Sequence, residues 1–99
     1  MPMNRLVLSA QLVERGALRY TPAGLPALDL SLKHESEVVE NGAPRKVSLE
    51  IRALAIGADI TAVLTTLALG SNAEFGGFLA ALRNGRGMRF HITSVAPLG

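Results

Sequence analysis

The 99-residue chain has no cysteine and no tryptophan, and aromatic residues make up only 4% of it. The absence of cysteine excludes a disulfide framework and any thiol chemistry. Because 48% of the residues are hydrophobic and so few are aromatic, the core must be mainly aliphatic, and the surface offers few rings on which a ligand could stack. The length fits one domain, residues 1–99, built around a single core.

Long hydrophobic runs are also missing. No segment approaches the roughly 18 consecutive apolar residues of a membrane-spanning helix. The first residues, Met1 to Arg5, lack the longer apolar stretch of a signal peptide. We therefore expect a soluble, cytoplasmic protein that does not associate with a membrane.

The residues that usually carry metal or catalytic chemistry are sparse. The only two histidines, His34 and His91, have no carboxylate partner at metal-ligand spacing, so no metal site is expected. A Ser-His-Asp set can be chosen on paper from Ser36, His34 and Asp29, but nothing in the sequence fixes its geometry. We therefore expect no catalytic residues and no cofactor.

Basic residues are concentrated near the end of the chain. From Phe75 onward there are three basic residues and no acidic one, whereas the first 74 residues hold seven basic and eight acidic residues. The three cations are Arg83, Arg86 and Arg89, at the expected tip of a hairpin between two apolar runs. Asn84-Gly85 supplies residues that tolerate the positive φ of a tight turn. Such a hairpin suggests a phosphate backbone as partner, and a merely solubilising surface is the alternative.

Apolar and polar residues alternate in three segments, which is typical of half-buried strands. The segments are Arg5 to Glu14, Leu28 to Lys33 and Val47 to Ala55. Two prolines and two glycines in residues 16–26 predict an irregular connection between the first two strands. The second and third strands are expected to form a long hairpin across a polar loop, Glu35 to Lys46, with its turn at Asn41-Gly42.

The second half of the chain completes a small barrel. Apolar residues spaced at three and four positions predict a short helix over Ala58 to Leu69, closed by Gly70. The runs Phe75 to Leu82 and Phe90 to Ala96 supply two more strands, and Gly76-Gly77 suits a sharp bend. Five strands with a helix between the third and fourth give the order of an OB-fold, an all-β barrel. SH3-like barrels and other small β domains are the alternatives.

Several phrases of the sequence are similar to those of one protein family. They are Asn4 to Ser9, Leu18-Arg19 followed by Thr21 to Pro26, Leu32 to Ser36, and Gly77 to Leu79 ahead of Arg83-Asn84-Gly85. In these phrases the chain resembles the primosomal replication protein N (PriB) family over nearly its whole length. The resemblance implies a homodimeric OB-fold without enzymatic activity that binds single-stranded DNA with little sequence preference. It also implies a role in restarting stalled replication forks, as a bridge between the restart helicase and later primosome components.

The resemblance also indicates where DNA would bind. The family's contacts fall mainly on the hairpin between the last two strands, which carries the three arginines here. An exposed aromatic on the family's third strand corresponds to Ser48 in this chain. Because one stacked base contributes about 1–3 kcal/mol, this departure predicts weaker or more salt-sensitive binding. The candidate nucleic-acid-binding residues are Arg83, Arg86, Arg89, Arg45, Lys46, Ser48, Arg52 and Arg19.

Other interpretations of these residues stay open. One alternative is that Arg45, Lys46 and Arg52 pair with nearby acidic residues instead of DNA, since cross-strand charge pairs are common. The three phenylalanines are expected in the core, with the alternative that one reaches the binding face. Pairing of the first strand across a twofold axis would protect an exposed edge and form the dimer. A dimeric protein-interaction adaptor with weak single-stranded DNA binding is the alternative function.

Overall fold

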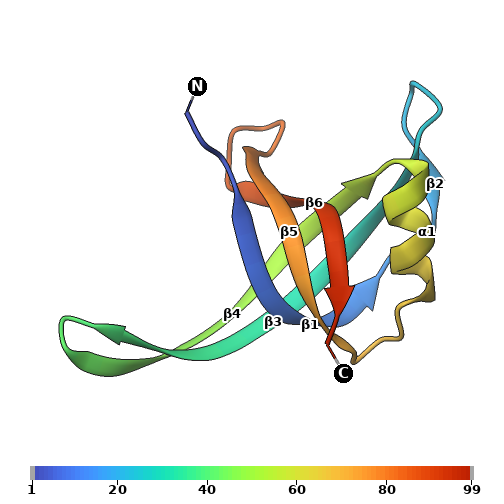
Figure 1. Ribbon diagram of the computed structural model, residues 1–99. Coiled ribbons are helices and arrows are strands. Elements are labelled where there is room, and N and C mark those ends of the chain that lie inside the picture. The colour runs from blue at the N-terminus through green and yellow to red at the C-terminus, as the bar shows by residue number, and fades with distance from the viewer. Residues whose placement is uncertain (1, 99) are drawn as a thin grey trace.

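The computed structural model describes residues 2–98, which form six strands and one helix. In chain order the elements are β1 (Leu6–Arg15), β2 (Arg19–Tyr20), β3 (Pro26–Glu40), β4 (Ala43–Ile56), α1 (Ala58–Thr66), β5 (Asn72–Ala81) and β6 (Met88–Pro97). The strands form one sheet in the order β1-β5-β6-β4-β3-β2, and β1 also pairs with β3, which closes a barrel (Figure 1). The five long strands and the short helix confirm the predicted OB-fold.

The helix differs from its prediction in two details. It lies between the fourth and fifth strands in the numbering, because Arg19 and Tyr20 pair with Ala27 and Pro26 to form the short β2 within the connection expected to be irregular. It also ends at Thr66 rather than Leu69, since Leu67 has extended backbone angles, φ −74° and ψ 122°. At nine residues, the helix of the described chain is too short to cross a membrane.

The end of α1 is held by a side chain from the barrel. The Arg15 guanidinium donates hydrogen bonds to the carbonyl oxygens of Leu64 and Leu67, at 3.1 and 2.5 Å. The last carbonyls of a helix have no partner within it and carry a partial negative charge, so a cation stabilises them. Arg15 therefore connects the last turn of the helix to β1.

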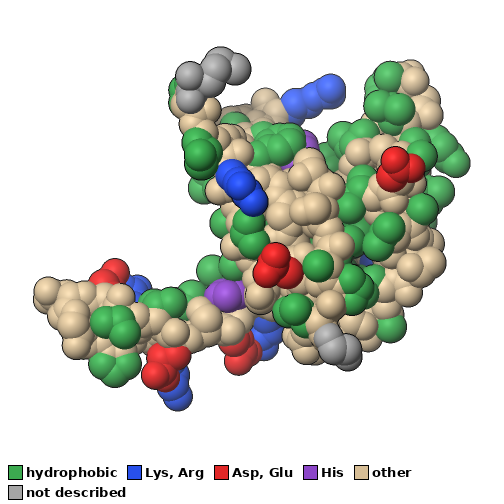
Figure 2. All heavy atoms as spheres, viewed as in Figure 1, with side chains coloured by type: hydrophobic (Ala, Val, Ile, Leu, Met, Phe, Trp, Pro, Cys, Tyr) green, Lys and Arg blue, Asp and Glu red, His purple; other side chains and the backbone are tan. Residues whose placement is uncertain are grey.

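The hairpin of β3 and β4 is longer than the sequence pattern indicated. Register pairs continue from Ala27 and Ile56 to Glu40 and Ala43, so the predicted polar loop from Glu35 to Lys46 is wrong and only the Asn41-Gly42 turn separates the strands. Beyond Lys33, β3 is paired only with β4 among the described strands. We call this outer part, residues 35–48, the arm. It extends away from the barrel in Figure 1, and in Figure 2 it carries hydrophobic, acidic and basic side chains together.

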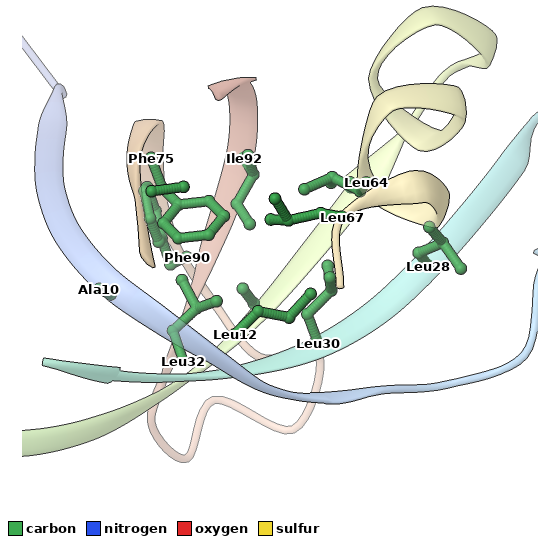
Figure 3. Packing of buried hydrophobic residues seen from close by; sticks show 13 residues of the cluster. Ala10, Leu12, Leu28, Leu30, Leu32, Leu64, Leu67, Phe75, Phe90 and Ile92 are labelled. Atoms are coloured by element: carbon green, nitrogen blue, oxygen red, sulfur yellow. The ribbon is translucent and has the colours of Figure 1, made fainter. Parts of the chain in front are cut away.

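The core lies inside the barrel and is largely aliphatic, as predicted (Figure 3). The largest side chains that are almost completely buried are Leu12, Leu28, Leu32, Leu64, Phe75 and Phe90. The alternating leucines of β1 and β3 therefore face inward, and two of the three phenylalanines join them. Phe78 does not, because 37% of its surface is exposed.

The bend expected at Gly76-Gly77 is present. The register of β5 and β6 shifts between these glycines, which marks a β-bulge. A Cβ atom on Gly77 would lie 1.7 Å from the carbonyl oxygen of His91. Glycine is thus needed there because the two backbones approach more closely than any side chain permits.

Candidate nucleic-acid interface

Two rows of side chains cross the outside of the barrel over β3, β4, β6 and β5. The strand register defines each row, because residues that are directly opposite on adjacent strands point to the same side. The first row is Asp29, Leu54, His91 and Phe78. The second row consists of two register pairs, Ser31 with Arg52 and Arg89 with Ala80, each two positions along its strands from the first row. We call these eight residues the outer face. Candidate residues from distant parts of the sequence meet on it.

Arginines surround Asp29 at one end of the outer face. Arg19, from β2, forms a salt bridge with Asp29 at 2.8 Å, and Arg89 lies 3.9 Å from the same carboxylate. The hydrogen bond from Arg19 lowers the pKa of Asp29; burial opposes this shift, and the charges of Arg19, Arg89 and Arg52 add to it. Asp29 is therefore ionised at neutral pH and partly neutralises the cations around it. A groove of about 400 Å³, lined by Asp29, Arg52, Leu82 and Arg89, opens at this point.

The loop between β5 and β6, residues 82–87, carries Arg83 and Arg86. Its shape is set by hydrogen bonds from the Gly85 amide to the Leu82 carbonyl and from the Arg86 amide to the Asn84 side chain. Positive φ angles occur at Gly85 and Gly87, whereas Asn84, predicted to adopt one, does not. Both arginines are exposed and form no salt bridge within residues 2–98. The loop therefore presents two cations whose charge no nearby carboxylate offsets.

Arg89 is not part of that hairpin tip. It lies on β6 within the outer face, where it approaches Asp29, and about one third of its side chain is exposed. The prediction of three arginines at one tip is therefore wrong for this residue. The three still lie within one hairpin, two on its loop and one on its strand.

The arm holds Arg45 and Lys46 in a different setting. Arg45 forms a salt bridge with Glu40 at 2.6 Å, and Lys46 lies opposite Glu37 in the register. The alternative that these cations pair with acidic residues is thus confirmed for Arg45. Seven positions along β4 separate Arg45 from Arg52, or about 23 Å of extended strand. The structure therefore does not bring the cations of the arm together with those of the outer face.

Ser48 lies at the base of the arm. It is exposed on β4 opposite Glu35, whose carboxylate is 3.4 Å from the Lys33 ammonium group. A serine hydroxyl offers a hydrogen bond but no flat apolar surface. The position where the family resemblance implies an aromatic therefore has no stacking surface in this chain.

An aromatic side chain that the sequence analysis placed in the core lies on the outer face instead. The Phe78 ring stacks on the His91 imidazole, with ring centroids 4.8 Å apart and an interplanar angle of 11°. Burial and the charge of Arg89 lower the pKa of His91. Counting by twos from the buried Phe75 puts Phe78 on the outside. The continuous apolar run around these residues concealed that signal.

The other histidine has a structural environment. His34 Nδ1 lies 2.6 Å from the Ser9 carbonyl oxygen, and its Nε2 lies 2.8 Å from the Ser36 hydroxyl. These bonds tie the base of the arm to β1. No three histidine or acidic side chains within residues 2–98 are grouped as metal ligands would be.

Comparison with known proteins places this geometry in a family. Residues 4–94 match a family described as another single-strand binding protein family. The replication restart protein PriB of Bordetella pertussis is 56% identical over 82% of this chain and 75% of its own length. The replication restart protein PriB of Neisseria meningitidis serogroup B is 52% identical over 58% of both chains.

Solved structures of similar fold agree with the family found by sequence comparison. The structure of PriB from Ralstonia solanacearum has a TM-score of 0.88 and 38% identity, and the match covers 97% of this chain and 98% of that one. The single-stranded DNA binding protein of Thermus aquaticus has a TM-score of 0.76 and 26% identity, with 98% of this chain and 50% of that chain covered. The chain belongs to the replication restart protein PriB family, which has the fold of single-strand binding proteins.

Proposed function

We propose that this protein binds single-stranded DNA during replication restart and holds the phosphate backbone with the arginines of the β5–β6 hairpin and the outer face. One observation carries the proposal: Arg83 and Arg86 lack acidic partners among the described residues, and their loop adjoins a face that holds Arg89 and Arg52. Family membership supports the same ligand. No enzymatic step is part of the proposal.

The binding is mainly electrostatic. Cations that neutralise phosphates release condensed counterions, so affinity falls as salt rises, with a logarithmic slope of about −0.7 per phosphate for single strands. Three phosphate contacts per protomer give a slope of about −2, and one strand that engages two protomers gives about −4. Arginines that contact phosphates do not distinguish bases, so sequence preference is low.

A homodimer is part of the proposal. β1 pairs with β5 through Leu6 to Gln11 and with β3 through Gln11 to Arg15, so the first half of β1 has one unpaired edge. Val7 in this half is 48% exposed. Antiparallel pairing of two such edges across a twofold axis would satisfy their backbone groups. The interface is therefore narrower than the Arg5 to Glu14 strand expected from the sequence.

The cellular role follows from the family. The relatives are named replication restart proteins. We propose that this chain, in the cytoplasm, bridges the restart helicase and later primosome proteins while it holds single-stranded DNA. Such a bridge needs protein-binding surface beyond the arginines, and the arm, with Val38 and Val39 exposed, offers it.

The test is fluorescence anisotropy of a labelled oligo-dT at several salt concentrations, with the wild type beside the Arg83→Ala/Arg86→Ala/Arg89→Ala variant. We expect salt-dependent binding with the slopes given above, and its loss in the variant. A flat salt dependence, or equal binding by the two proteins, would contradict the proposal.

A second candidate is a dimeric adaptor in which DNA binding is weak. Two observations favour it: Ser48 provides no stacking surface, and Arg45 is bound to Glu40. In that case the protein would bind and stimulate the helicase without measurable affinity for oligo-dT at low salt. Helicase stimulation by the triple-alanine variant, measured beside its DNA affinity, separates the two functions.

A further inference from the structure

A second concavity lies on the outside of the barrel, beyond the outer face. It has a volume of about 420 Å³ and spans β1, β5 and β6, with Gly76 and Gly77 of the middle strand between its two sides. Because these glycines have no side chains, β5 leaves the space above this part of the sheet unfilled. We call this concavity the trough. Its other lining residues are Asn4, Arg5, Val7, Glu74, Phe78, Thr93 and Ser94.

Phe78 borders the trough, and its ring is stacked on a neighbouring ring. His91 covers one face of the ring in a parallel stack, and 37% of the Phe78 surface remains exposed. The stack on His91 favours one orientation of the Phe78 ring, and the imidazole covers only one of its two faces. The pair is therefore a preformed surface on which a flat group can stack.

Arg5 is held beside this ring. The Asn4 side chain donates to the Leu79 carbonyl at 2.7 Å and accepts from the Leu79 amide at 3.0 Å, which fixes the chain before β1 against β5. Leu6 pairs with Gly77 in an antiparallel register, so Arg5 and Phe78 are the next positions along the two chains, and both line the trough. A cation and an aromatic surface thus stand next to each other across two strands.

These groups match the chemistry of a nucleotide. A base stacks on an aromatic face whatever its identity, and the adjacent phosphate is attracted to a guanidinium group. The trough's volume falls within the roughly 300–1,000 Å³ of small-molecule sites. Glu74 would repel phosphates, which directs the backbone toward Arg5. The trough also adjoins the outer face, because Phe78 and His91 stand at the end of its first row and Arg89 lies in the second row beside them.

We infer that Phe78, backed by His91, is a base-stacking platform and that Arg5 contacts the neighbouring phosphate, so that the trough is a subsite for one nucleotide of single-stranded DNA. The inference rests on the proposed function and extends the DNA path from the β5–β6 loop across Arg89 to β1. It also supplies an aromatic contact in a chain whose Ser48 has none.

The first experiment compares an oligo-dT with an abasic oligonucleotide of the same length, which has phosphates but no bases. Phe78→Leu keeps an apolar side chain and removes the ring. We expect this variant to bind oligo-dT about tenfold more weakly, within the range of one stacked base, and to bind the abasic strand as the wild type does. Arg5→Ala should weaken binding of both strands, since it removes a phosphate contact.

The second experiment uses the absence of tryptophan from the chain. Phe78→Trp introduces a single tryptophan at the platform, and stacking of a base on it should quench the tryptophan emission. We expect quenching by oligo-dT and none by the abasic strand. Val63→Trp, at an exposed position of α1, is the matched control and should not respond to either strand.

The outcomes separate the subsite from the function. The subsite is overturned if Phe78→Leu binds oligo-dT as tightly as the wild type does. It is also overturned if oligo-dT does not quench the emission of Phe78→Trp. Either result leaves the proposed function intact. Failure of the wild type to bind oligo-dT even at low salt overturns both. Equal melting temperatures of the wild type and Phe78→Leu show that a loss of affinity comes from the missing ring and not from unfolding.

Discussion

The β5–β6 loop and the arm are both hairpin ends that carry two basic residues, yet their electrostatic character is opposite. The arm holds three acidic and two basic residues in positions 35–48, a net charge of −1, and one of its cations forms a salt bridge with Glu40. The loop, residues 82–87, holds two arginines and no acid, a net charge of +2. A phosphate is attracted by the field that remains after nearby charges cancel, so the count of cations alone does not locate a DNA site.

Paired double variants test this comparison most directly. Arg83→Ala/Arg86→Ala should lower the affinity for oligo-dT about tenfold at moderate salt and reduce the salt slope by about 1.4, the value for two phosphate contacts. Arg45→Ala/Lys46→Ala removes the same charge from the arm and should change affinity by less than about threefold. The measurement is anisotropy titration across a salt series. An equal loss in both variants would show that the pairing with Glu40 does not matter.

Asp29 tests the same effect of nearby carboxylates on the outer face, where acidic groups offset only part of the positive charge. Asp29→Asn removes the carboxylate that binds Arg19 and attracts Arg89. We expect the affinity for oligo-dT to rise about threefold, because two guanidinium groups become available to phosphates. Asp59→Asn, on the first turn of α1, makes the same charge change away from the cluster and should have a smaller effect. A loss of affinity in Asp29→Asn would mean that Asp29 positions its arginines for DNA.

Much of the barrel could be predicted from the sequence, because burial leaves a period of two. The inward leucines of β1 and β3 were found this way, and their turn residues located the hairpins. The arm was missed for the converse reason: beyond Lys33 no layer covers the strands, so their side chains do not alternate and their charges resemble a loop. A strand without burial has no hydrophobic pattern to detect.

The composition of the candidate site was predictable, but its arrangement was not. Arg83 and Arg86 could be grouped as neighbouring exposed cations because both belong to one turn, and their contact with DNA stays a prediction. The approach of Arg89 to Asp29 joins residues sixty positions apart and depends on the parallel pairing of β4 with β6. No local pattern encodes a pairing of that kind. The stack of Phe78 on His91 likewise depends on the register of β5 with β6, which places the two residues opposite each other.

A smaller effect is expected from unbalancing the arm. Glu40→Gln releases Arg45 from its salt bridge, and Glu37→Gln removes the acid opposite Lys46. The double variant changes the arm's net charge from −1 to +1, and we expect affinity for oligo-dT to rise about twofold, since exposed ion pairs are weak. Adding Arg45→Ala should reverse part of the gain. If the double variant binds no better than the wild type, the arm lies outside the DNA path even when its cations are free.

The two histidines offer the last and smallest test, because one belongs to the outer face and the other to the base of the arm. Burial and the charge of Arg89 lower the pKa of His91, so the folded protein binds fewer protons at this ring than the unfolded chain does. The resulting stability is fully present above the ordinary histidine pKa of about 6.5 and is lost as pH falls below it toward the folded pKa. The melting temperature of the wild type should therefore decrease when the pH is lowered from about 7.5 to about 5.5. The decrease should be smaller in His91→Gln. His34→Asn removes the bonds to Ser9 and Ser36 but retains His91, so this variant should keep the full decrease in melting temperature. If the wild type and His91→Gln showed the same pH dependence, His91 would not be the cause of the decrease.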